Sequence, residues 1–337
     1  MKDTPRIAFL FTNDRRGIVE QAKKGDDADT ALRGANHVAG AALFSVDTSR
    51  HALLAKLLSY DSVVISDNLV LGWIVATLSR IMRAHTRVVY VAMNSSTLLR
   101  RHAHHPVRRA LLTMFWKSYA RVVCLSQSQL EDFAKAGIPR ERLVFIPFGI
   151  DADFFASGAN VQEGEYVMSV GRDAARDWPL LLEAAKQSQY PFVIITTYKS
   201  LPADTRLPPN VSVRYNLSAR EVRDLYSRAR LVVVPSKSDS SPEGSDCSGQ
   251  TALLDAMAAG NPVVATERSW IRDYLVPDED LVVVPAQDPT ALAHVIDALW
   301  QDAALRTRLG SAGRAKVQAR YTTKTFASAL QKLIETL

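Results

Sequence analysis

Cysteine is scarce in this chain: Cys124 and Cys247 are the two thiols among 337 residues. Two cysteines are too few for a disulfide framework and are typical of a protein in a reducing compartment. The sequence also lacks the CxxC and HExxH motifs that commonly hold zinc. We therefore expect neither structural disulfides nor a bound metal ion.

Long apolar runs are missing as well. Residues 7–12 are apolar, but the run is too short for the core of a secretory signal and predicts a buried strand. Residues 69–78 are apolar over roughly half the length needed to cross a bilayer. We expect a cytoplasmic protein, either soluble or attached to the inner face of the plasma membrane.

Acidic residues are absent from residues 68–130, which hold nine Lys/Arg and four His. The first 150 residues carry 21 Lys+Arg and 12 Asp+Glu, whereas the whole chain has a net charge of +6. Such a stretch is either a solvated basic face or a surface that meets an anion, such as a phospholipid or a phosphate-bearing acceptor. No nucleic-acid-binding module accompanies it, so nucleic acid is not an expected partner. The candidate acceptor or membrane surface comprises Arg100, Arg101, Arg108, Arg109, Trp116 and Lys117.

A helix is expected over residues 106–120, inside this basic stretch. It mixes the apolar side chains of Leu111, Phe115, Trp116 and Tyr119 with several cations. Packing in a core and contact with a membrane explain the apolar residues equally well.

Short apolar runs alternate with helical patterns along the whole chain, and the runs are rich in Val and Ile, as strands of buried parallel sheets are. The expected strands are residues 6–11, 41–46, 62–66, 87–92, 122–125, 143–147, 166–170, 192–197, 211–215, 231–234, 262–265 and 281–284. Strand–helix alternation in both halves predicts an α/β protein with two doubly wound, Rossmann-like domains that face a cleft. The domains are expected at residues 1–150 (the acceptor side) and 165–320 (the nucleotide-sugar side), with a linker at 151–164 and a C-terminal helix at 321–337 that packs back on the first domain.

The most informative segment is residues 236–266, which read SKSDSSPEGSDCSGQTALLDAMAAGNPVVAT. A polar loop follows a buried strand and enters a helix near Ser248 and Gly249. The N–H groups of a helix N-terminus made of small residues can hold a phosphate, and Gln250 and Thr251 belong to the same turn. Asp255, one helical turn after Thr251, could accept hydrogen bonds from sugar hydroxyls. The alternative is that Ser248 is an ordinary helix cap and Asp255 a surface acid.

A second turn of this kind follows the strand at residues 166–170. Gly171 and Arg172 come directly after the strand, and Arg176 precedes the next helix. Carboxyl ends of parallel strands meet at one edge of a sheet, and guanidinium groups form charge-assisted bonds with phosphates. The two turns together predict a diphosphate site.

These segments resemble the large retaining glycosyltransferase family four, which includes sucrose synthase and bacterial mannosyl- and glucosyltransferases. SVGRDAARDWPLLLEAA is similar to the family's turn in which an arginine and a lysine hold the donor diphosphate, with Arg172 at the arginine position and Arg176 in place of the lysine. LLDAMAAGNPVVAT is similar to the family's helix, with Asp255 at the position of a ribose-binding glutamate, and IPFGIDADFF is similar to its interdomain turn. The resemblance implies the fold with two facing Rossmann-like domains.

The chain departs from the family pattern at three places. Cys247 stands where the family has a sugar-binding glutamate, so that either Glu243 or Asp246 takes this role or Ser248, Gly249 and Gln250 recognise the sugar. The family's catalytic histidine is replaced within VAMNSST, where Asn94 or Ser95 is the positional candidate. The usual glycine-rich loop after the first strand is also absent.

The resemblance implies a metal-independent transfer of a sugar, with retention of configuration, from a nucleoside diphosphate sugar to a hydroxyl group. The implied acceptor is a lipid-linked or polysaccharide intermediate of cell-surface glycan synthesis, and no cofactor besides the donor is expected. The implied catalytic residues are Asn94, Arg172 and Arg176, and the implied donor-binding residues are Gly171, Arg172, Arg176, Glu243, Ser248, Gly249, Gln250, Thr251 and Asp255. A sugar-nucleotide epimerase of the same fold and a non-catalytic nucleotide-sugar-binding subunit remain the alternatives.

Overall fold

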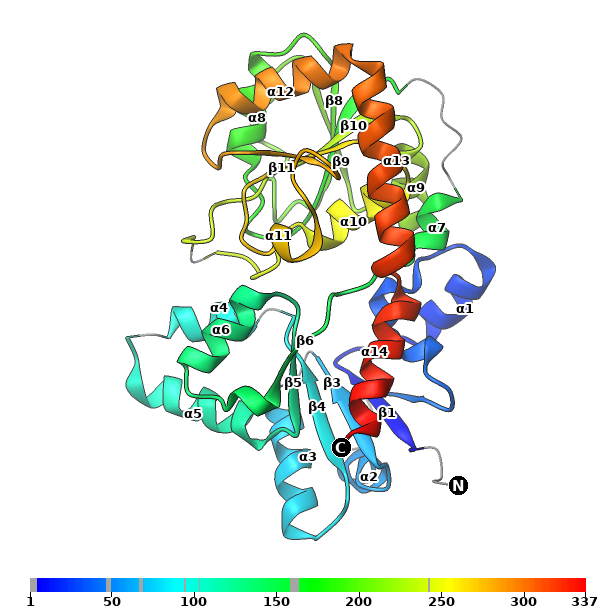
Figure 1. The fold of residues 1–337 in the computed structure, drawn as a ribbon, viewed down its shortest axis with the longest axis vertical. Coiled ribbons are helices and arrows are strands. Elements are labelled where there is room, and N and C mark those ends of the chain that lie inside the picture. The colour runs from blue at the N-terminus through cyan, green and yellow to red at the C-terminus, as the bar shows by residue number, and fades with distance from the viewer. Residues whose placement is uncertain are drawn as a thin grey trace. The chain divides into compact units, whose positions relative to one another are not determined.

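The computed structural model describes residues 5–46, 50–66, 69–93, 95–102, 104–157, 164–241 and 243–337. The chain folds into two compact units, each built on one parallel sheet (Figure 1). The first unit contains the chain up to Lys24, Asp29–Gly149 and Thr323–Leu337, and the second contains Gly25–Ala28 and Ile150–Thr322. The predicted pair of doubly wound α/β domains is confirmed.

The sheet of the first unit has six strands in the order β2-β1-β3-β4-β5-β6, all parallel. The strands are β1 (Ile7–Phe11), β2 (Ala42–Ser45), β3 (Ser62–Ile65), β4 (Arg87–Val91), β5 (Arg121–Cys124) and β6 (Leu143–Phe145). Every residue of β1 and β3 is buried because helices and loops cover both faces of the sheet. Near-continuous apolar sequences satisfy this environment, whereas alternating ones would bury polar side chains.

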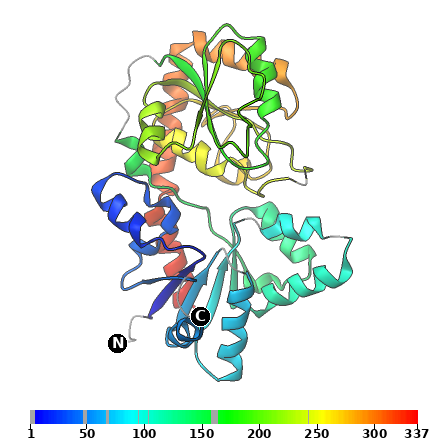
Figure 2. The same cartoon turned by 180° about the vertical axis from the view of Figure 1, so that it is seen from behind.

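Helices of the first unit flank this sheet. They are α1 (Arg16–Lys24), η1 (Asp29–Leu32), η2 (Ala35–His37), α2 (Arg50–Leu57), α3 (Leu69–Ile81), α4 (Ser95–Arg101), α5 (Pro106–Ser118), α6 (Gln127–Lys135), η3 (Arg140–Arg142) and α14 (Thr323–Glu335). The helices α4, α5 and α6, coloured cyan to green, lie on one side of the sheet, and α14, in red, lies on the other (Figure 2).

The final helix, α14, completes the core of the first unit. Phe326 packs edge-on against Phe148, with 5.4 Å between the ring centroids. Gly34 has a φ of +79°, and a Cβ built on it would lie 2.9 Å from the Cβ of Ala327. Glycine at this position therefore serves both the left-handed backbone and the close approach of α14.

The second unit repeats the architecture with the parallel order β12-β11-β10-β7-β8-β9. Its strands are β7 (Tyr166–Val170), β8 (Phe192–Thr196), β9 (Val211–Tyr215), β10 (Ala229–Val234), β11 (Val263–Thr266) and β12 (Val282–Val284). Its helices are α7 (Ala152–Ala156), α8 (Trp178–Lys186), α9 (Ala219–Tyr226), α10 (Gln250–Ala258), α11 (Ile271–Tyr274), α12 (Pro289–Gln301) and α13 (Ala303–Arg320). Because β7 and β10 are parallel neighbours, the turns that follow them meet at the carboxyl edge of this sheet.

None of the helices in the described part of the chain is long and apolar enough to cross a membrane. The apolar residues at 69–78 belong to α3, where Gly72, Val75, Ala76 and Ser79 are buried against the rest of the first unit.

Candidate active site

The turn after β7 is held by the carboxylate of Asp173. Its Oδ1 accepts hydrogen bonds from the N–H of Ala175 at 2.8 Å and from the N–H of Ser245 at 3.2 Å. Burial raises the pKa of Asp173, but these hydrogen bonds outweigh it and hold the pKa below its ordinary value. Asp173 therefore joins this turn to the loop that precedes α10 as an ionised group.

Arg176 extends from this turn beneath the carboxyl edge of the sheet and is 5% exposed. Its Nη1 donates to the Oγ of Ser236, 3.3 Å away, and its Nε has no hydrogen-bond partner among the described residues. Burial lowers the pKa of Arg176 to about 10, although Asp173 raises it, so the guanidinium is charged at neutral pH. A buried cation that lacks an ion-pair partner in the described structure favours the arrival of an anion.

Two glycines make room for this guanidinium. A Cβ on Gly171 would lie 2.0 Å from the Nε of Arg176, and a Cβ on Gly249 would lie 2.8 Å from its Nη1. Gly249 also has a φ of +91° and forms the N-cap of α10, which no side chain caps. The alternative interpretation of Ser248 as the helix cap is therefore wrong, because Gly249 occupies that position.

Asp255 lies within α10 and is buried. Burial raises its pKa well above the ordinary value, and the nearby carboxylate of Asp151 adds to this effect. Its Oδ1 has no hydrogen-bond partner in the described part of the chain. The alternative interpretation of Asp255 as a surface acid is therefore wrong, and its Oδ1 is a buried acceptor that lacks a donor among the described residues.

The remaining residues of the predicted donor site differ in their burial. Ser248 and Gln250 are buried, and the Nε2 of Gln250 has no partner among the described residues. Thr251 and Arg172 are exposed. Glu243 forms an ion pair with Lys237 at the surface, whereas Asp246 is 8% exposed.

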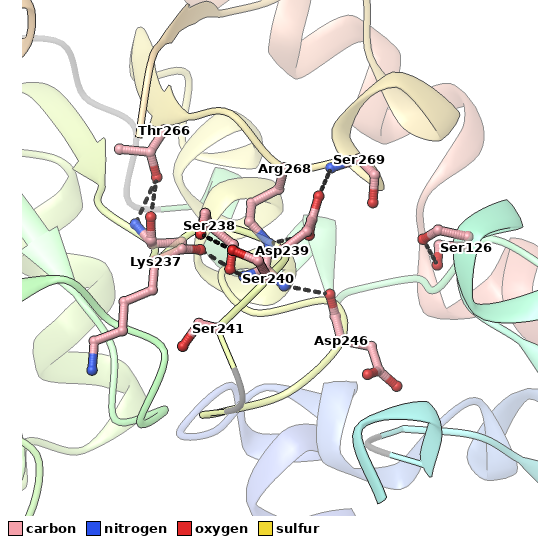
Figure 3. A network of polar contacts seen from close by, with 12 residues as sticks. Ser126, Lys237, Ser238, Asp239, Ser240, Ser241, Asp246, Thr266, Arg268 and Ser269 are labelled. Atoms are coloured by element: carbon pink, nitrogen blue, oxygen red, sulfur yellow. Dashed lines mark hydrogen bonds and ion pairs between the residues drawn. The ribbon is translucent and has the colours of Figure 1, made fainter. Parts of the chain in front are cut away.

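A buried arginine that the sequence analysis missed fixes the polar loop before α10 (Figure 3). Arg268 is 3% exposed, and it donates to the backbone carbonyls of Lys237 at 2.7 Å and Asp246 at 2.9 Å. Its Nε lies 2.8 Å from the Oδ1 of Asp239. Arg268 thereby ties both ends of the loop to the strand β11. The position of Arg268, two residues after a buried strand, could have indicated a role at the site. Its hydrogen-bond partners are backbone atoms, which the sequence does not reveal.

An aromatic pair at the same edge of the sheet was missed as well. Tyr198 follows β8 and Tyr215 ends β9, and their rings stack with centroids 4.1 Å apart. Tyr198 is 58% exposed, so one aromatic face is available for a planar ligand. The parallel register of Thr196 beside Tyr215 brings the two rings together.

On the first unit, Asn94 lies outside the described residues. Its alternative, Ser95, is buried and shares a hydrogen bond of 2.9 Å with the hydroxyl of Tyr90. The predicted acceptor or membrane surface is exposed at Arg100, Arg101, Arg108, Arg109 and Lys117.

Trp116 corrects the prediction for that surface. Its side chain is fully buried and packs edge-on against Phe133, with 5.0 Å between the ring centroids. Trp116 belongs to the core because α5 turns this face toward α6 and the sheet. The exposed face of α5 instead carries Val107, Leu111 and Met114, which are 72%, 47% and 43% exposed.

Within the described ranges, no group of three or more His, Cys, Asp or Glu side chains could hold a metal ion.

Comparison with known proteins identifies the family. Residues 167–302 match the family model "Glycosyl transferases group 1", and residues 23–154 match the model "Glycosyltransferase Family 4". The two matches cover both units, and the chain belongs to glycosyltransferase family 4, a family of retaining enzymes.

Curated relatives match part of the chain. The D-inositol 3-phosphate glycosyltransferase of Xylanimonas cellulosilytica is 27% identical over 229 residues, which are 58% of this chain and 52% of the relative. The phosphatidyl-myo-inositol mannosyltransferase of Mycobacterium tuberculosis is 28% identical over 218 residues, or 58% of this chain and 54% of the relative. The matched region thus spans about half the length of these relatives.

Solved structures share the whole fold. Anabaena HepE in complex with UDP-glucose superposes with a TM-score of 0.71 at 16% identity, covering 99% of this chain and all of that one. The sucrose-phosphate synthase of Thermosynechococcus elongatus superposes with a TM-score of 0.68 at 17% identity, covering 98% of each chain.

Proposed function

We propose that this chain transfers a sugar from a nucleoside diphosphate sugar to a hydroxyl acceptor with retention of configuration. The observation that carries the proposal is the guanidinium of Arg176. It is buried and charged, lacks an ion-pair partner in the described structure, and lies against Gly171 and Gly249 at the carboxyl edge of the second sheet.

The chemical task is to stabilise the charge that develops on the departing diphosphate. When the bond between the anomeric carbon and the diphosphate breaks, its electron pair leaves with the phosphate oxygen. Arg176, the exposed Arg172 and the uncapped N-terminus of α10 present positive charge to that oxygen. Because Arg176 and the N-terminus of α10 are fixed before the reaction, they require little reorganisation during it.

The rest of the donor has matching partners nearby. The unpartnered Oδ1 of Asp255 can accept a hydrogen bond from a ribose hydroxyl, and Gln250 can donate one to the sugar or a phosphate. Tyr198, stacked on Tyr215, offers an aromatic face to the nucleotide base. Asn94 remains the candidate acceptor-side catalytic residue, since the hydroxyl of Ser95 is already bonded to Tyr90.

For the acceptor, we propose a molecule that carries a phosphoinositol group, free or on a lipid. The names of two curated relatives share this group. Arg101, Arg108, Arg109 and Lys117 supply exposed cations on the first unit, and the exposed apolar side chains of α5 suit a lipid surface. The protein then works at the surface of an anionic membrane when its acceptor is a lipid.

A donor panel tests this function. UDP- and GDP-sugars are incubated with the full chain alone, then with inositol 3-phosphate, then with phosphatidylinositol vesicles, and the release of nucleotide is measured. We expect one donor to turn over faster with a phosphoinositol acceptor, and the anomeric proton coupling of the product to match that of the donor. Nucleotide binding without turnover under every condition would favour a non-catalytic subunit, and inversion would contradict the mechanism.

A further inference from the structure

A basic cavity lies in the first unit, at the edge of the sheet where strands begin. It has a volume of about 370 Å³, within the range of small-molecule pockets. Four arginines line it together with Thr336 and the last residue, Leu337, and no acidic side chain does. The arginines are Arg80, Arg87, Arg121 and Arg142.

Strand register explains why these arginines gather. Arg87 is the first residue of β4 and Arg121 the first residue of β5. Val89 lies beside Arg121, so Arg87, two residues before Val89, projects from the same face of the sheet. The pairing of Val122 with the first residue of β6 brings the preceding Arg142 next to Arg121. The last turn of α3 adds Arg80.

Two of the arginine side chains are hydrogen-bonded to backbone carbonyls around the cavity, and the other two are available to bind an anion. Arg121 donates to the carbonyl of Ala120 at 2.8 Å, and Arg142 donates to the carbonyls of Lys117 and Tyr119, the latter at 3.4 Å. The side chains of Arg80 and Arg87 are exposed and make no hydrogen bond or ion pair with other described residues. Adjacent like charges destabilise a sheet, so an anion between these groups would relieve their repulsion.

We propose that this cavity binds a small phosphate-bearing molecule at a site separate from the donor site. Guanidinium groups match phosphate oxygens in charge and geometry, and several of them converge here. Parallel α/β sheets bind their substrates at the carboxyl edge, whereas this cavity lies at the amino edge of the first sheet. The ligand is therefore a second anion and not the donor.

Melting of the full chain in inorganic phosphate, against chloride of equal ionic strength, tests the site. We expect phosphate to raise the wild-type melting temperature by about 3–6 °C at ten times its dissociation constant. R80A/R87A should weaken phosphate binding at least tenfold by calorimetry and should melt no lower than wild type in chloride. The matched control is Arg83→Ala, an exposed arginine outside the cavity lining, which should keep the shift. Arg176→Ala should lose only the part of the shift that comes from phosphate at the donor site.

Equal phosphate shifts in wild type and R80A/R87A would overturn the proposal. So would a double variant that melts lower in chloride with an unchanged phosphate affinity, because the arginines would then be structural. Sedimentation with phosphatidylglycerol vesicles separates a lipid headgroup from a free phosphate. If R80A/R87A loses vesicle binding and phosphate does not shift the wild-type melting temperature, the cavity binds a lipid headgroup and the proposal of a soluble ligand is wrong.

Discussion

The Nη1 of Arg176 approaches Gly249 so closely that a Cβ on the glycine would stand 2.8 Å from it. Gly249, the N-cap of α10, and Arg176, from the turn after β7, are therefore one structural unit. Gly249→Ala should displace both, because it adds this contact to the strain of a φ of +91°. We expect a loss of more than about 1 kcal/mol in unfolding free energy and weaker nucleotide binding. Gly137→Ala, also at positive φ but away from this site, controls for strain alone.

Arg176→Ala and Arg172→Ala should each weaken the binding of a nucleoside diphosphate by about 1–3 kcal/mol, the range for a charged hydrogen bond. The effect of Arg172 should be the smaller one and should fade with salt, because its side chain is exposed. The parent nucleoside should bind unchanged in isothermal titration calorimetry. An equal loss for diphosphate and nucleoside would remove these residues from the diphosphate site.

Asp255→Asn should lower the affinity for donor and free nucleotide alike, since the carboxyl group is assigned to the ribose. An effect on turnover with intact nucleotide affinity would reassign Asp255 to the transferred sugar or to catalysis. Titration calorimetry and initial rates on one preparation separate the two outcomes.

The raised pKa of Asp255 predicts that the stability of the free protein depends on pH. The folded pKa of this residue lies above the ordinary value, so its contribution to stability is fully present below about pH 4 and is lost as pH rises through the raised pKa. The free protein should therefore lose stability over that interval, and Asp255→Asn should lose less. Denaturant unfolding at several pH values measures this, with the exposed Asp224→Asn as the control. Parallel curves for wild type and Asp255→Asn would contradict the raised pKa.

Arg268→Ala should release the loop before α10. The substitution removes the charged hydrogen bonds that Arg268 donates to the carbonyls of the loop. We expect it to lower the unfolding free energy by about 2–4 kcal/mol and to weaken nucleotide binding. Arg272→Ala is the matched control, because its ion pair with Glu267 is exposed and should contribute about 0–1 kcal/mol. Equal stability losses in the two variants would mean that Arg268 does not hold the loop.

Vesicle binding tests the basic surface of the first unit. Each cation near an anionic bilayer contributes about 1 kcal/mol, and the attraction is screened within a Debye length, so binding should weaken strongly between low and moderate salt. Charge reversal at Arg100, Arg101, Arg108 and Arg109 should release the protein without changing nucleotide affinity. Reversal at Arg206 and Arg214 in the second unit, both exposed, serves as the control. Equally weak sedimentation with neutral and anionic vesicles would end the membrane hypothesis.

Strand positions were predictable because burial on both faces of a parallel sheet leaves a simple signal. In the described part of the chain, each strand begins and ends within two residues of its predicted bounds, as β7 and β9 illustrate. The helix α1 was missed because it has no buried residue and its sequence is largely polar. Its few apolar residues stand among many charged ones, so its sequence does not resemble that of a helix packed in a core.

Sequence can point to a position where the backbone demands a particular residue type, but it cannot show where side chains meet backbone atoms. Gly171 and Gly249 stood out in the sequence because the turns leave no space for a Cβ. Arg268 binds carbonyls some 22 to 31 residues earlier in the chain, a relationship that no local pattern encodes. Trp116 was ambiguous because a helix with cations on one face can still bury its aromatic side chain on the other.

Because the last helix of the chain, α14, belongs to the first unit, the two units complete their folds in a particular order during synthesis. The first unit needs α14, which leaves the ribosome only after every residue of the second unit. The second unit can therefore close its sheet during translation, while the first waits, with the contact of Ala327 on Gly34 and of Phe326 on Phe148 still unmade. During that interval the nascent first unit exposes part of its core, and this is when a chaperone or a protease would act on it.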